Sequence, residues 1–475
     1  MDQATRRSPP AIHARLSLLV DILERGLVER RRVVRLILLA ALAGEHSLLI
    51  GPPGTAKSEL ARRLHAVFAN ARYFERLLTR FSVPEELFGP LSIKALEEDR
   101  YERHTAGFLP DAAVAFIDEV FKANSAILNA LLTLLNEREF DNGSGRQRCP
   151  LISAIGATNE VPEDEVAEAF FDRFLLRVPV EPVSAAGFGR LLETDPRAGW
   201  ATPSAELRLN AEDLATLSNM AACVSLPADV ATVLCELRAH FATEQIYVSD
   251  RRWVKAVWLL RVAAACEGRD AVALWDVLLL PCCTAPDAPR QAAVGDWLQA
   301  RLGVRAALSP PRLTRVVEAF EAQLDAEHKA NDLDYDESGR LRFTASELAG
   351  EIGDAKGGAG ALRMSYNRQR RYGAGHIAAR TSQVDELLVR IDGYAEELSA
   401  HRNSLAAYRA CSLWLDAGLA AGVDANLAAV DAVLTSLRQR AEAARDGYSR
   451  LPPLPAAEDK GEVPEPVSHP GLEGE

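Results

Sequence analysis

The sequence predicts an α/β fold, in which a five-stranded parallel sheet is followed by an all-helical segment and a helical C-terminal domain. Between residues 46 and 182, short apolar runs alternate with helical stretches, which is the pattern of buried parallel strands joined by helices. Residues 185–285 are helical throughout, and residues 380–447 carry near-heptad apolar spacing. The five predicted strands are Ser47–Ile50, Tyr73–Leu78, Val114–Ile117, Ile152–Ala157 and Phe174–Val180.

The helical elements follow from the same periodicity. Residues 16–43 form one long amphipathic helix or two short ones that end at Gly44, and residues 59–68 form a helix after the first strand. Residues 85–108 are long and mixed in character, so we expect an insertion there. The two helices of residues 380–447 have heptad seams too short for an independent coiled-coil dimer, and we expect them to pack within the chain.

The rest of the C-terminal region gives weaker signals. The Gly- and acid-rich stretch 332–360 predicts a small irregular insert, and its Asp332, Asp334 and Asp336 lack the glycine and glutamate that a calcium loop requires. The tail after Leu451 is rich in Pro, Glu and Gly, and we expect it to be disordered. The predicted boundaries are 1–184 for the α/β core with an insert at about 82–108, 185–285 for the helical segment, 286–330 with 380–447 for the C-terminal domain, 331–379 for its insert and 451–475 for the tail.

Composition narrows the class of protein. With 475 residues, of which 48% are hydrophobic and 25% charged, the chain has the composition of a soluble globular protein. The net charge of −13 argues against a general nucleic-acid binder. Residues 1–15 lack a signal-peptide core, and the apolar run 33–43 is interrupted by Arg35 and too short to span a bilayer, so no transmembrane segment is expected. Seven scattered cysteines fit a reducing cytoplasm.

The strongest motif follows the first predicted strand. A glycine-bearing loop, Lys-Ser and a helix form the arrangement that cradles nucleotide phosphates, because backbone N–H groups point at the anion. Lys57 would neutralise the β and γ phosphates of ATP or GTP, and the Ser58 hydroxyl would ligate Mg²⁺. Ala56 stands where glycine is usual, which requires a negative φ angle. The phosphate-binding residues are Gly51, Pro52, Pro53, Gly54, Thr55, Ala56, Lys57 and Ser58.

Two acidic residues end the third predicted strand. Phosphoryl transfer to water needs one carboxylate to hold Mg²⁺ and another to orient or deprotonate the water. Asp118 suits the first role, as a metal ligand with Ser58, and Glu119 suits the second. The alternative is that the acids only cap a helix.

Three further polar residues are catalytic candidates. Asn159 follows the fourth strand and would position the water or sense the γ-phosphate; its alternative role is to cap a turn. Arg173 lies between apolar residues before the last strand and would reach the nucleotide of a neighbouring subunit; its alternative is a simple ion pair with Asp172 or another acid. Arg251 and Arg252 open a helix of the second segment, and one of them would contact the nucleotide from there; Arg251 is our candidate.

These residues together resemble the MoxR branch of the AAA+ ATPases, most closely its RavA-type members. The resemblance covers about residues 16–280, and Ala56 before the lysine is also seen in that family. It rests on the phosphate loop and on four other strings: residues 78–93 (LTRFSVPEELFGPLSI), 128–138 (LNALLTLLNER), Asp172-Arg173 and 247–253 (YVSDRRW).

The resemblance implies a five-stranded AAA+ P-loop core, an all-helical lid and hexameric rings with ATP and Mg²⁺ at the subunit interfaces. It implies Walker A at residues 51–58, Walker B at Asp118 and Glu119, sensor 1 at Asn159, the arginine finger at Arg173 and sensor 2 at Arg251. Residues 85–108 would hold an insert that faces the ring pore. Such proteins remodel other proteins, as chaperones do, together with a partner that carries a von Willebrand A domain.

The C-terminal third departs from the RavA-type pattern. Those proteins insert a compact β-rich domain into a helical one, whereas residues 332–379 here contain few β-type runs. Partners recruited by the β-rich module are therefore not carried over to this chain.

Two other classes of function stay open on the sequence. A nucleic-acid-dependent AAA+ motor would use the basic and aromatic stretch 363–372, in which tyrosines could stack on bases. A small-molecule kinase on a P-loop scaffold would form a phosphorylated product, but it leaves Arg173 and Arg251 without a role. We expect ATP hydrolysis that drives protein remodelling.

Overall fold

The computed structural model describes residues 12–143, 145–159, 165–195, 199–305, 308–330, 370–457, 459, 461 and 463–469. The chain divides into two compact units, which we describe separately. The first comprises residues 1–302 and 405–423, and the second comprises residues 303–404 and 424–475.

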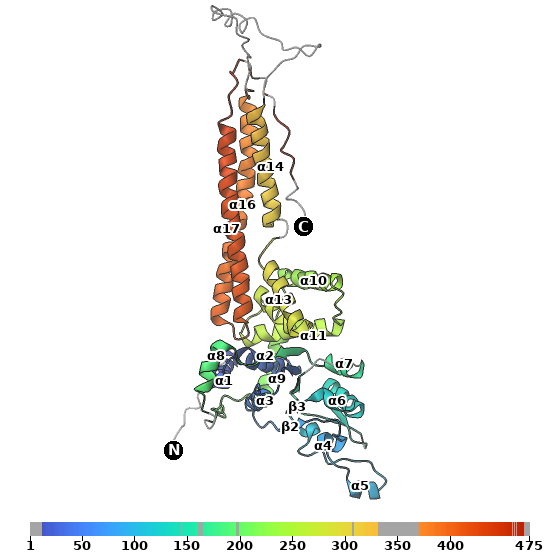
Figure 1. Ribbon diagram of the computed structural model, residues 1–475. Coiled ribbons are helices and arrows are strands. Elements are labelled where there is room, and N and C mark those ends of the chain that lie inside the picture. Colours follow the sequence, from blue (N-terminus) through green and yellow to red (C-terminus); the bar gives the residue numbers. More distant parts are fainter. Residues whose placement is uncertain are drawn as a thin grey trace, which may run out of the picture. The chain divides into compact units, whose positions relative to one another are not determined.

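The first unit is built on a five-stranded sheet with the strand order β2-β3-β6-β1-β7 (Figure 1). All pairings in it are parallel, as the alternation of apolar and helical runs predicts. β1 lies between β6 and β7, and β3 pairs with the other side of β6. The strands are β1 (Ser47–Ile50), β2 (Tyr73–Leu77), β3 (Val114–Asp118), β6 (Ser153–Thr158) and β7 (Leu176–Pro179).

The predicted strands therefore all exist, with ends that differ by one or two residues. The N-terminal helical region consists of two helices, and the side chains of α2 are buried along nearly its whole length. One small antiparallel pair, β4 with β5, was not expected from the sequence. The other elements of the core are α1 (Ile12–Glu24), α2 (Arg31–Leu42), α3 (Lys57–His65), α6 (Ser125–Glu137), β4 (Glu139–Asp141), β5 (Arg146–Arg148) and α7 (Glu165–Phe171).

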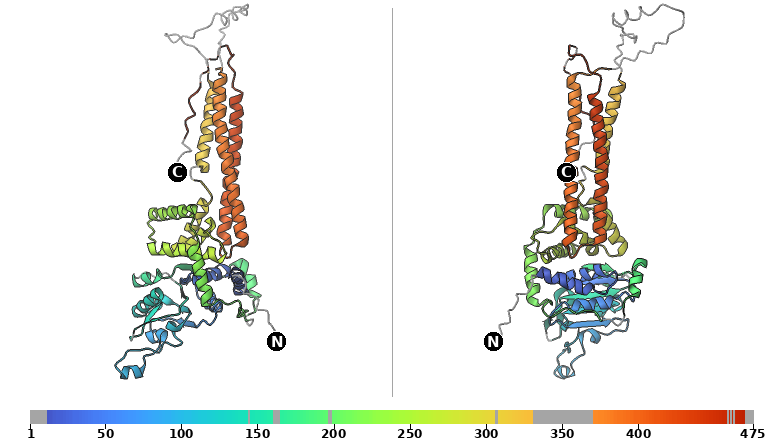
Figure 2. Two further views of the ribbon diagram at one scale, coloured as in Figure 1. Left: turned by 180° about the vertical axis from the view of Figure 1, so that it is seen from behind. Right: turned by 90° about the vertical axis from the view of Figure 1, so that its left-hand side faces the viewer.

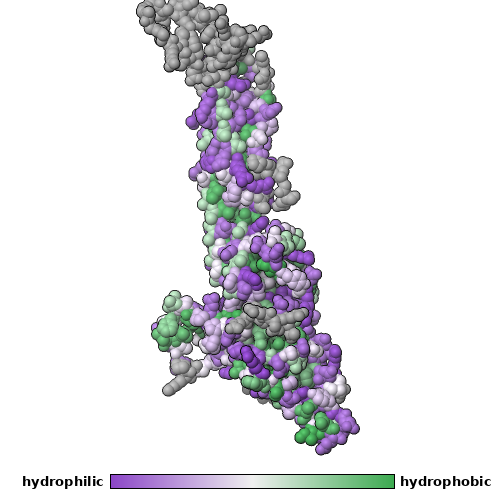
Figure 3. Space-filling model, turned by 45° about the vertical axis from the view of Figure 1, so that its right-hand side comes forward, coloured by the Kyte–Doolittle hydropathy of each residue, from purple (hydrophilic) through white to green (hydrophobic). Residues whose placement is uncertain are grey.

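The insertion after β2 contains the short helices α4 (Pro84–Phe88) and α5 (Ile93–Glu97). Leu87 and Phe88 anchor α4 in the apolar core of the sheet. Ile93 is 78% exposed, and Phe81, just before the insertion, is 91% exposed. Figure 3 shows apolar surface at this end of the core. The base of the insertion therefore packs into the core, whereas its tip exposes apolar side chains to solvent.

The segment after β7 is helical, as predicted. Polar side chains fix the starts of several helices: Ser184 caps α8, Asn210 caps α9 and Ser249 caps α11. The compact unit extends to Leu302, beyond the boundary expected at residue 285. Its helices are α8 (Ala185–Leu192), α9 (Ala211–Cys223), α10 (Ala228–Thr243), α11 (Asp250–Cys266), α12 (Leu280–Thr284) and α13 (Ala288–Arg301).

The second unit contains long helices that lie side by side (Figures 1 and 2). They are α14 (Pro310–Lys329), α16 (Ala374–Cys411) and α17 (Ala417–Ser449), and the ends of α16 and α17 that meet at residues 405–423 belong to the first unit. Ion pairs such as Arg440–Glu321 and Arg438–Asp392 join neighbouring helices. The helices pack within the chain, as the short heptad seams predict.

By length and composition alone, α17 is apolar enough to cross a membrane. Its buried side chains recur at alternating spacings of three and four, however, which is the seam of a packed helix and not the uniform surface of a membrane span. We interpret α17 as a bundle helix. The buried positions are Ala420, Val423, Leu427, Val430, Leu434, Leu437, Ala441, Ala444 and Tyr448.

The structure describes little of the expected insert 331–379 but much of the expected tail 451–475. Residues 331–369 of the insert, including the aspartates 332–336, lie outside the described residues, as does most of the basic stretch 363–372. The last residues of the expected insert, from Ala374, belong to α16. Tyr372 of that stretch is only 4% exposed and donates its hydroxyl to the Glu327 carbonyl, so it is not available to stack on a base. The tail, expected to be disordered from residue 451, contacts the second unit: the Leu454 N–H donates to the Tyr372 carbonyl, and the Glu465 carbonyl accepts from Arg380.

Candidate functional site

The phosphate loop lies between β1 and α3, at the carboxyl edge of the sheet. A side chain at Gly51 would place its Cβ 2.1 Å from the Val180 carbonyl oxygen, and Gly54 has a φ of +80°, so both positions require glycine. The Thr55 hydroxyl donates to the Pro52 carbonyl at 3.0 Å and closes the turn. The loop is therefore held in a compact shape by its own backbone and by the start of the segment after β7.

The expectation for Ala56 was wrong. Its φ is +67° and its ψ is 24°, in the left-handed region and not at negative φ. An L-residue in this conformation costs roughly 1–2 kcal/mol relative to the right-handed one. The loop imposes the torsion because Ala56 must turn the chain into the first turn of α3, where its carbonyl accepts from the Leu60 N–H.

Lys57 is buried at the base of the loop. Its Nζ donates to the Gly51 carbonyl, to the Pro52 carbonyl at 3.1 Å and to Asn159 Oδ1 at 3.4 Å. Burial lowers the pKa of Lys57, while the charges of Asp118 and Glu119 oppose this shift. The ammonium group is thus confined among oxygen atoms at the position where a phosphate chain would lie.

The acid pair lies where the strand order predicts. Asp118 ends β3, and its Oδ1 accepts from the Glu119 N–H at 3.0 Å. Glu119 has a φ of +50°, which turns the chain away from the strand. Its side chain is only 16% exposed, and Oε2 lies 3.3 Å from Lys122 Nζ. Glu119 precedes a short 3₁₀ turn, but its side chain makes no capping bond there, so the capping alternative does not hold.

Asn159 connects the acid pair to the phosphate loop. It follows β6, the strand between β1 and β3, and its Nδ2 donates to Glu119 Oε1 at 2.9 Å. Because its Oδ1 accepts from Lys57, one side chain joins the phosphate-binding lysine to the glutamate. The structure thereby brings together Lys57, Asn159 and Glu119, which are separated in the sequence.

The residues present fit Mg²⁺ and a nucleoside triphosphate. Ser58 lies in the first turn of α3 and Asp118 at the end of β3, and both offer the oxygen ligands that Mg²⁺ prefers. The N-terminus of α3 and the confined Lys57 ammonium supply positive charge for phosphates.

Arg251 belongs to a separate cluster around Asp172, and Arg173 follows Asp172 in the chain. Arg173 lies between α7 and β7, and its Nε, though buried, has no hydrogen-bond partner in the described part of the chain. Arg251 is 45% exposed and lies 3.1 Å from Asp172 Oδ2. Within the described ranges, no hydrogen bond joins either arginine to the phosphate loop of the same chain. Among the described residues, Arg173 makes no ion pair with Asp172, whose carboxylate contacts other arginines, whereas the acids at 160 and 163–164 lie outside them, so the alternative of a pair with another acid stays open.

Asp172 is the centre of that cluster. Its carboxylate contacts Arg251, the Nε of Arg252 at 3.0 Å and Arg177 at 3.7 Å. Burial lowers the pKa of Arg177 to about 9, so this guanidinium still carries its charge at neutral pH. Sequence reasoning assigned no role to Arg177, which belongs to no motif, and within the string 247–253 it chose Arg251 over Arg252. Only the packing shows that Arg252 is buried while Arg251 is not.

A cavity of about 530 Å³ opens beside the phosphate loop. Arg30 lines it and donates from Nε to the Thr55 carbonyl at 3.2 Å, and Val180, which abuts Gly51, also lines it. The volume and the mixture of apolar and polar walls suit the base and ribose of a nucleotide. Sequence reasoning missed this cavity. Its lining residues are Glu29, Arg30, Arg32, Val33, Pro179, Val180, Glu181, Pro182, Ser184, Pro281, Ala288, Gln291, Ala292, Asp296, Asp416, Gly418 and Leu419.

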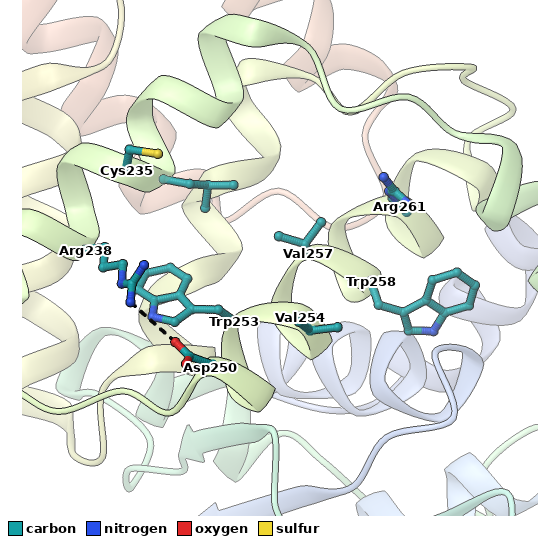
Figure 4. A pocket seen from close by; sticks show the side chains of 9 residues that line it. Cys235, Arg238, Asp250, Trp253, Val254, Val257, Trp258 and Arg261 are labelled. Atoms are coloured by element: carbon teal, nitrogen blue, oxygen red, sulfur yellow. Dashed lines mark hydrogen bonds and ion pairs between the residues drawn. The ribbon is translucent and has the colours of Figure 1, made fainter.

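A second hollow, of about 550 Å³, lies between α10 and α11 (Figure 4). Apolar side chains line most of it, and Arg238 lies 3.5 Å from Asp250 at its edge. The residues of the phosphate loop and the acid pair do not line it, so it is not the nucleotide site. Its lining residues are Leu234, Cys235, Arg238, Asp250, Trp253, Val254, Val257, Trp258 and Arg261.

Comparison with known proteins agrees with this geometry. Residues 14–219 match the family described as the MoxR domain in the MoxR-vWA-beta-propeller ternary systems. Residues 229–298 match the AAA lid domain family.

Individual relatives cover part of the chain. Two uncharacterized proteins of Methanocaldococcus jannaschii are 40% identical over 255 residues and 41% identical over 245 residues. These matches cover 53% and 51% of this chain, and 65% and 64% of the relatives. Protein MoxR of Paracoccus denitrificans is 28% identical over 191 residues, which is 39% of this chain and 56% of that protein. The chain thus spans less than two thirds of the length of these relatives.

Proposed function

We propose that residues 14–298, which form a MoxR-family AAA+ module, hydrolyse ATP with Mg²⁺ and drive the remodelling of partner proteins. The observation that carries the proposal is the side-chain connection from Lys57 through Asn159 to Glu119. It joins a group that binds phosphate to a group that can activate water, and hydrolysis needs both at one place.

The phosphate loop binds and orients the substrate. Backbone N–H groups at the start of α3 hold the phosphates, and Lys57 exchanges its bonds to the loop carbonyls for bonds to phosphate oxygens. Ser58 and Asp118 would hold Mg²⁺, which neutralises charge on the phosphates. Arg30 stabilises the loop through the hydrogen bond from its Nε to the Thr55 carbonyl.

Glu119 is the general base. Asn159 fixes one of its carboxylate oxygens, and Lys122 lies beside the other. When Lys57 moves to a phosphate, Asn159 loses one of its two partners, so the position of Glu119 responds to the presence of the nucleotide. A carboxylate so oriented accepts the proton of the attacking water.

Arg173 and Arg251 act on the nucleotide of a neighbouring copy. The exposed position of Arg251 supports this role, and among the described residues the Nε of Arg173 has no partner and neither arginine bonds to the phosphate loop of its own chain. A head-to-tail contact that repeats this arrangement closes into a ring. We propose the hexamer that the family resemblance implies, with one ATP at each interface.

The partner class follows from the family match. The matched family is described by MoxR-vWA-beta-propeller ternary systems, which supports a von Willebrand A domain protein as the partner of this chain. The narrower RavA-type assignment and a cytoplasmic location stay predictions. The seven cysteines, none of which is in a disulfide, support the location.

The variant Glu119→Gln tests the proposed hydrolysis. We expect it to bind ATP with the affinity of the unmodified chain and to lose turnover by roughly 10²–10⁴-fold, because glutamine cannot accept the proton. The measurement is phosphate release together with nucleotide binding. Affinity capture on the ATP-bound variant would then report whether a von Willebrand A domain protein is retained.

Glu137→Gln is the matched control. Glu137 pairs with Arg146 on the surface, and its loss should leave turnover unchanged. Full turnover in the Glu119 variant, or a phosphorylated small molecule in place of free phosphate, would contradict the proposal.

A further inference from the structure

The loop that joins α16 to α17 is fixed against the C-terminal end of α11 and against α2. Glu267 accepts hydrogen bonds from the Ser412 hydroxyl at 2.8 Å and from the Leu413 N–H at 2.7 Å. The Trp414 indole donates to the Ala263 carbonyl at 3.3 Å, and Arg35 donates to the Leu413 carbonyl at 2.7 Å. We call residues 412–419 the hairpin tip. They belong to the first compact unit and lie outside both family matches.

The hairpin tip reaches the cavity beside the phosphate loop. Asp416 pairs with Arg32 at 2.8 Å, and its other oxygen accepts from the Gly418 and Leu419 N–H groups at 2.8 and 3.0 Å. These bonds fix the turn that begins α17. As a result, Asp416, Gly418 and Leu419 line the cavity.

The tip also packs closely on α13. A Cβ added at Gly295 would lie 2.9 Å from Leu419 Cδ2, so this approach depends on the absence of a side chain at position 295. Leu419 is thereby held between α13 and the cavity. Leu419 thus adds an apolar side chain to the wall of the cavity, and it comes from outside the residues that match the two families.

Two residues that line the cavity also contact the phosphate loop. Val180 abuts Gly51 at the start of the loop, Arg30 bonds to Thr55 within it, and both residues line the cavity. A nucleotide with its phosphates in the loop must extend its ribose and base away from α3. The cavity is the space next to the loop that has the volume to accept them.

We propose that the hairpin tip completes the nucleotide site, with Leu419 forming a wall against the base and ribose and Asp416 positioning Arg32 beside them. The inference rests on the proposed function, in which residues 51–58 hold the phosphates. The tip lies between the C-terminal end of α16 and the start of α17, and most of both helices belongs to the second unit.

The test compares a ligand that has a base with one that has none. Leu419→Trp fills the cavity, so we expect the affinity of the full-length chain for ADP to fall at least about tenfold in calorimetry. The affinity for magnesium tripolyphosphate, which contacts the loop only, should be unchanged. Leu415→Trp is the matched control, because Leu415 lies in the same tip but does not line the cavity, and it should bind both ligands normally.

Hydrogen exchange of the unmodified chain gives a second measurement that needs no variant. We expect ADP to slow exchange both in residues 51–58 and in residues 412–419. Protection of the loop without the tip would overturn the inference, as would unchanged ADP affinity in Leu419→Trp or an equal loss of both ligands. Failure of the proposed function looks different: neither ADP nor tripolyphosphate would bind, and residues 51–58 would show no protection.

Discussion

At the scale of single residues, the site depends on backbone torsions that few residues tolerate. Ala56 and Glu119 both adopt positive φ, at +67° and +50°. Each turns the chain just where a side chain must face the nucleotide, so the strain lies beside the proposed chemistry. The octapeptide predicts what the loop binds, but it did not predict that Ala56 is strained, because its φ is set by the turn into α3.

Replacing Ala56 by glycine should relieve this strain. The left-handed conformation costs alanine roughly 1–2 kcal/mol, whereas the added unfolded-state freedom of glycine costs roughly 0.4–1 kcal/mol. We therefore expect Ala56→Gly to raise the apparent free energy of unfolding by about 0.5–1 kcal/mol in chemical denaturation. Ala61→Gly, in the buried interior of α3, is the control and should destabilise. A lower stability of Ala56→Gly would show that the torsion is not strained.

At the scale of elements, the buried side chain of Arg252 joins α11 to the core. Arg252 is 4% exposed and makes five hydrogen bonds, to the Asp172 carboxylate and to the carbonyls of Asp172, Phe174, Leu175 and Cys283. It therefore fixes the lid helix against the loop that carries Arg173. Arg251, the next residue along α11, makes one exposed contact to the same aspartate.

Substitution of the two neighbouring arginines should affect stability and ATP turnover differently. Arg252→Ala leaves Asp172 and several carbonyls without their donor, and we expect a loss of about 3–5 kcal/mol in the free energy of unfolding. Arg251→Ala removes an exposed ion pair and should cost no more than about 1 kcal/mol. It should nevertheless lower ATP turnover.

Denaturation and phosphate release on both variants check this assignment. Equal destabilisation by the two substitutions would refute the distinction between a buried and an exposed arginine. Normal turnover in Arg251→Ala would remove that residue from the proposed site.

At the scale of the whole molecule, the proposed site is shared between copies of the chain. Lys57, Asn159 and Glu119, which are joined by hydrogen bonds, would form one half, and Arg173 and Arg251 would supply the other. Copies that associate head to tail would join the halves at every interface. ATP turnover should then depend on assembly.

Mixing two inactive variants tests this dependence. Arg173→Ala should bind ATP yet lose turnover by roughly 10³-fold, and Lys57→Ala should fail to bind ATP. In a one-to-one mixture, about a quarter of random head-to-tail interfaces pair an intact phosphate loop with an intact Arg173, so turnover should partly recover. Phosphate release in the mixture is the measurement.

The control mixture combines Arg173→Ala with a chain that carries both substitutions, and it should stay inactive. Absence of recovery in the first mixture would contradict the shared site. Full turnover by dilute, strictly monomeric protein would contradict it as well.

Much of the proposed nucleotide site was predictable because it is local. Residues 51–58 and Asp118-Glu119 each follow an apolar strand, and the carboxyl ends of parallel strands meet at one edge of a sheet. Asn159 was a candidate for the same reason, since it follows β6. The strand order, with β6 between β1 and β3, then brings these side chains within hydrogen-bond distance.

The sequence by itself determined the chemistry of the loop and the alternation of strands and helices, because both depend on residues close together in the chain. Only the tertiary structure decided that Arg252 is buried while Arg251 is exposed, and that Leu419 lines the same cavity as Arg30. The burial of Arg252 and the position of Leu419 depend on contacts between residues that are far apart in the sequence. Local sequence patterns do not contain this information, because the packing of the whole unit determines it.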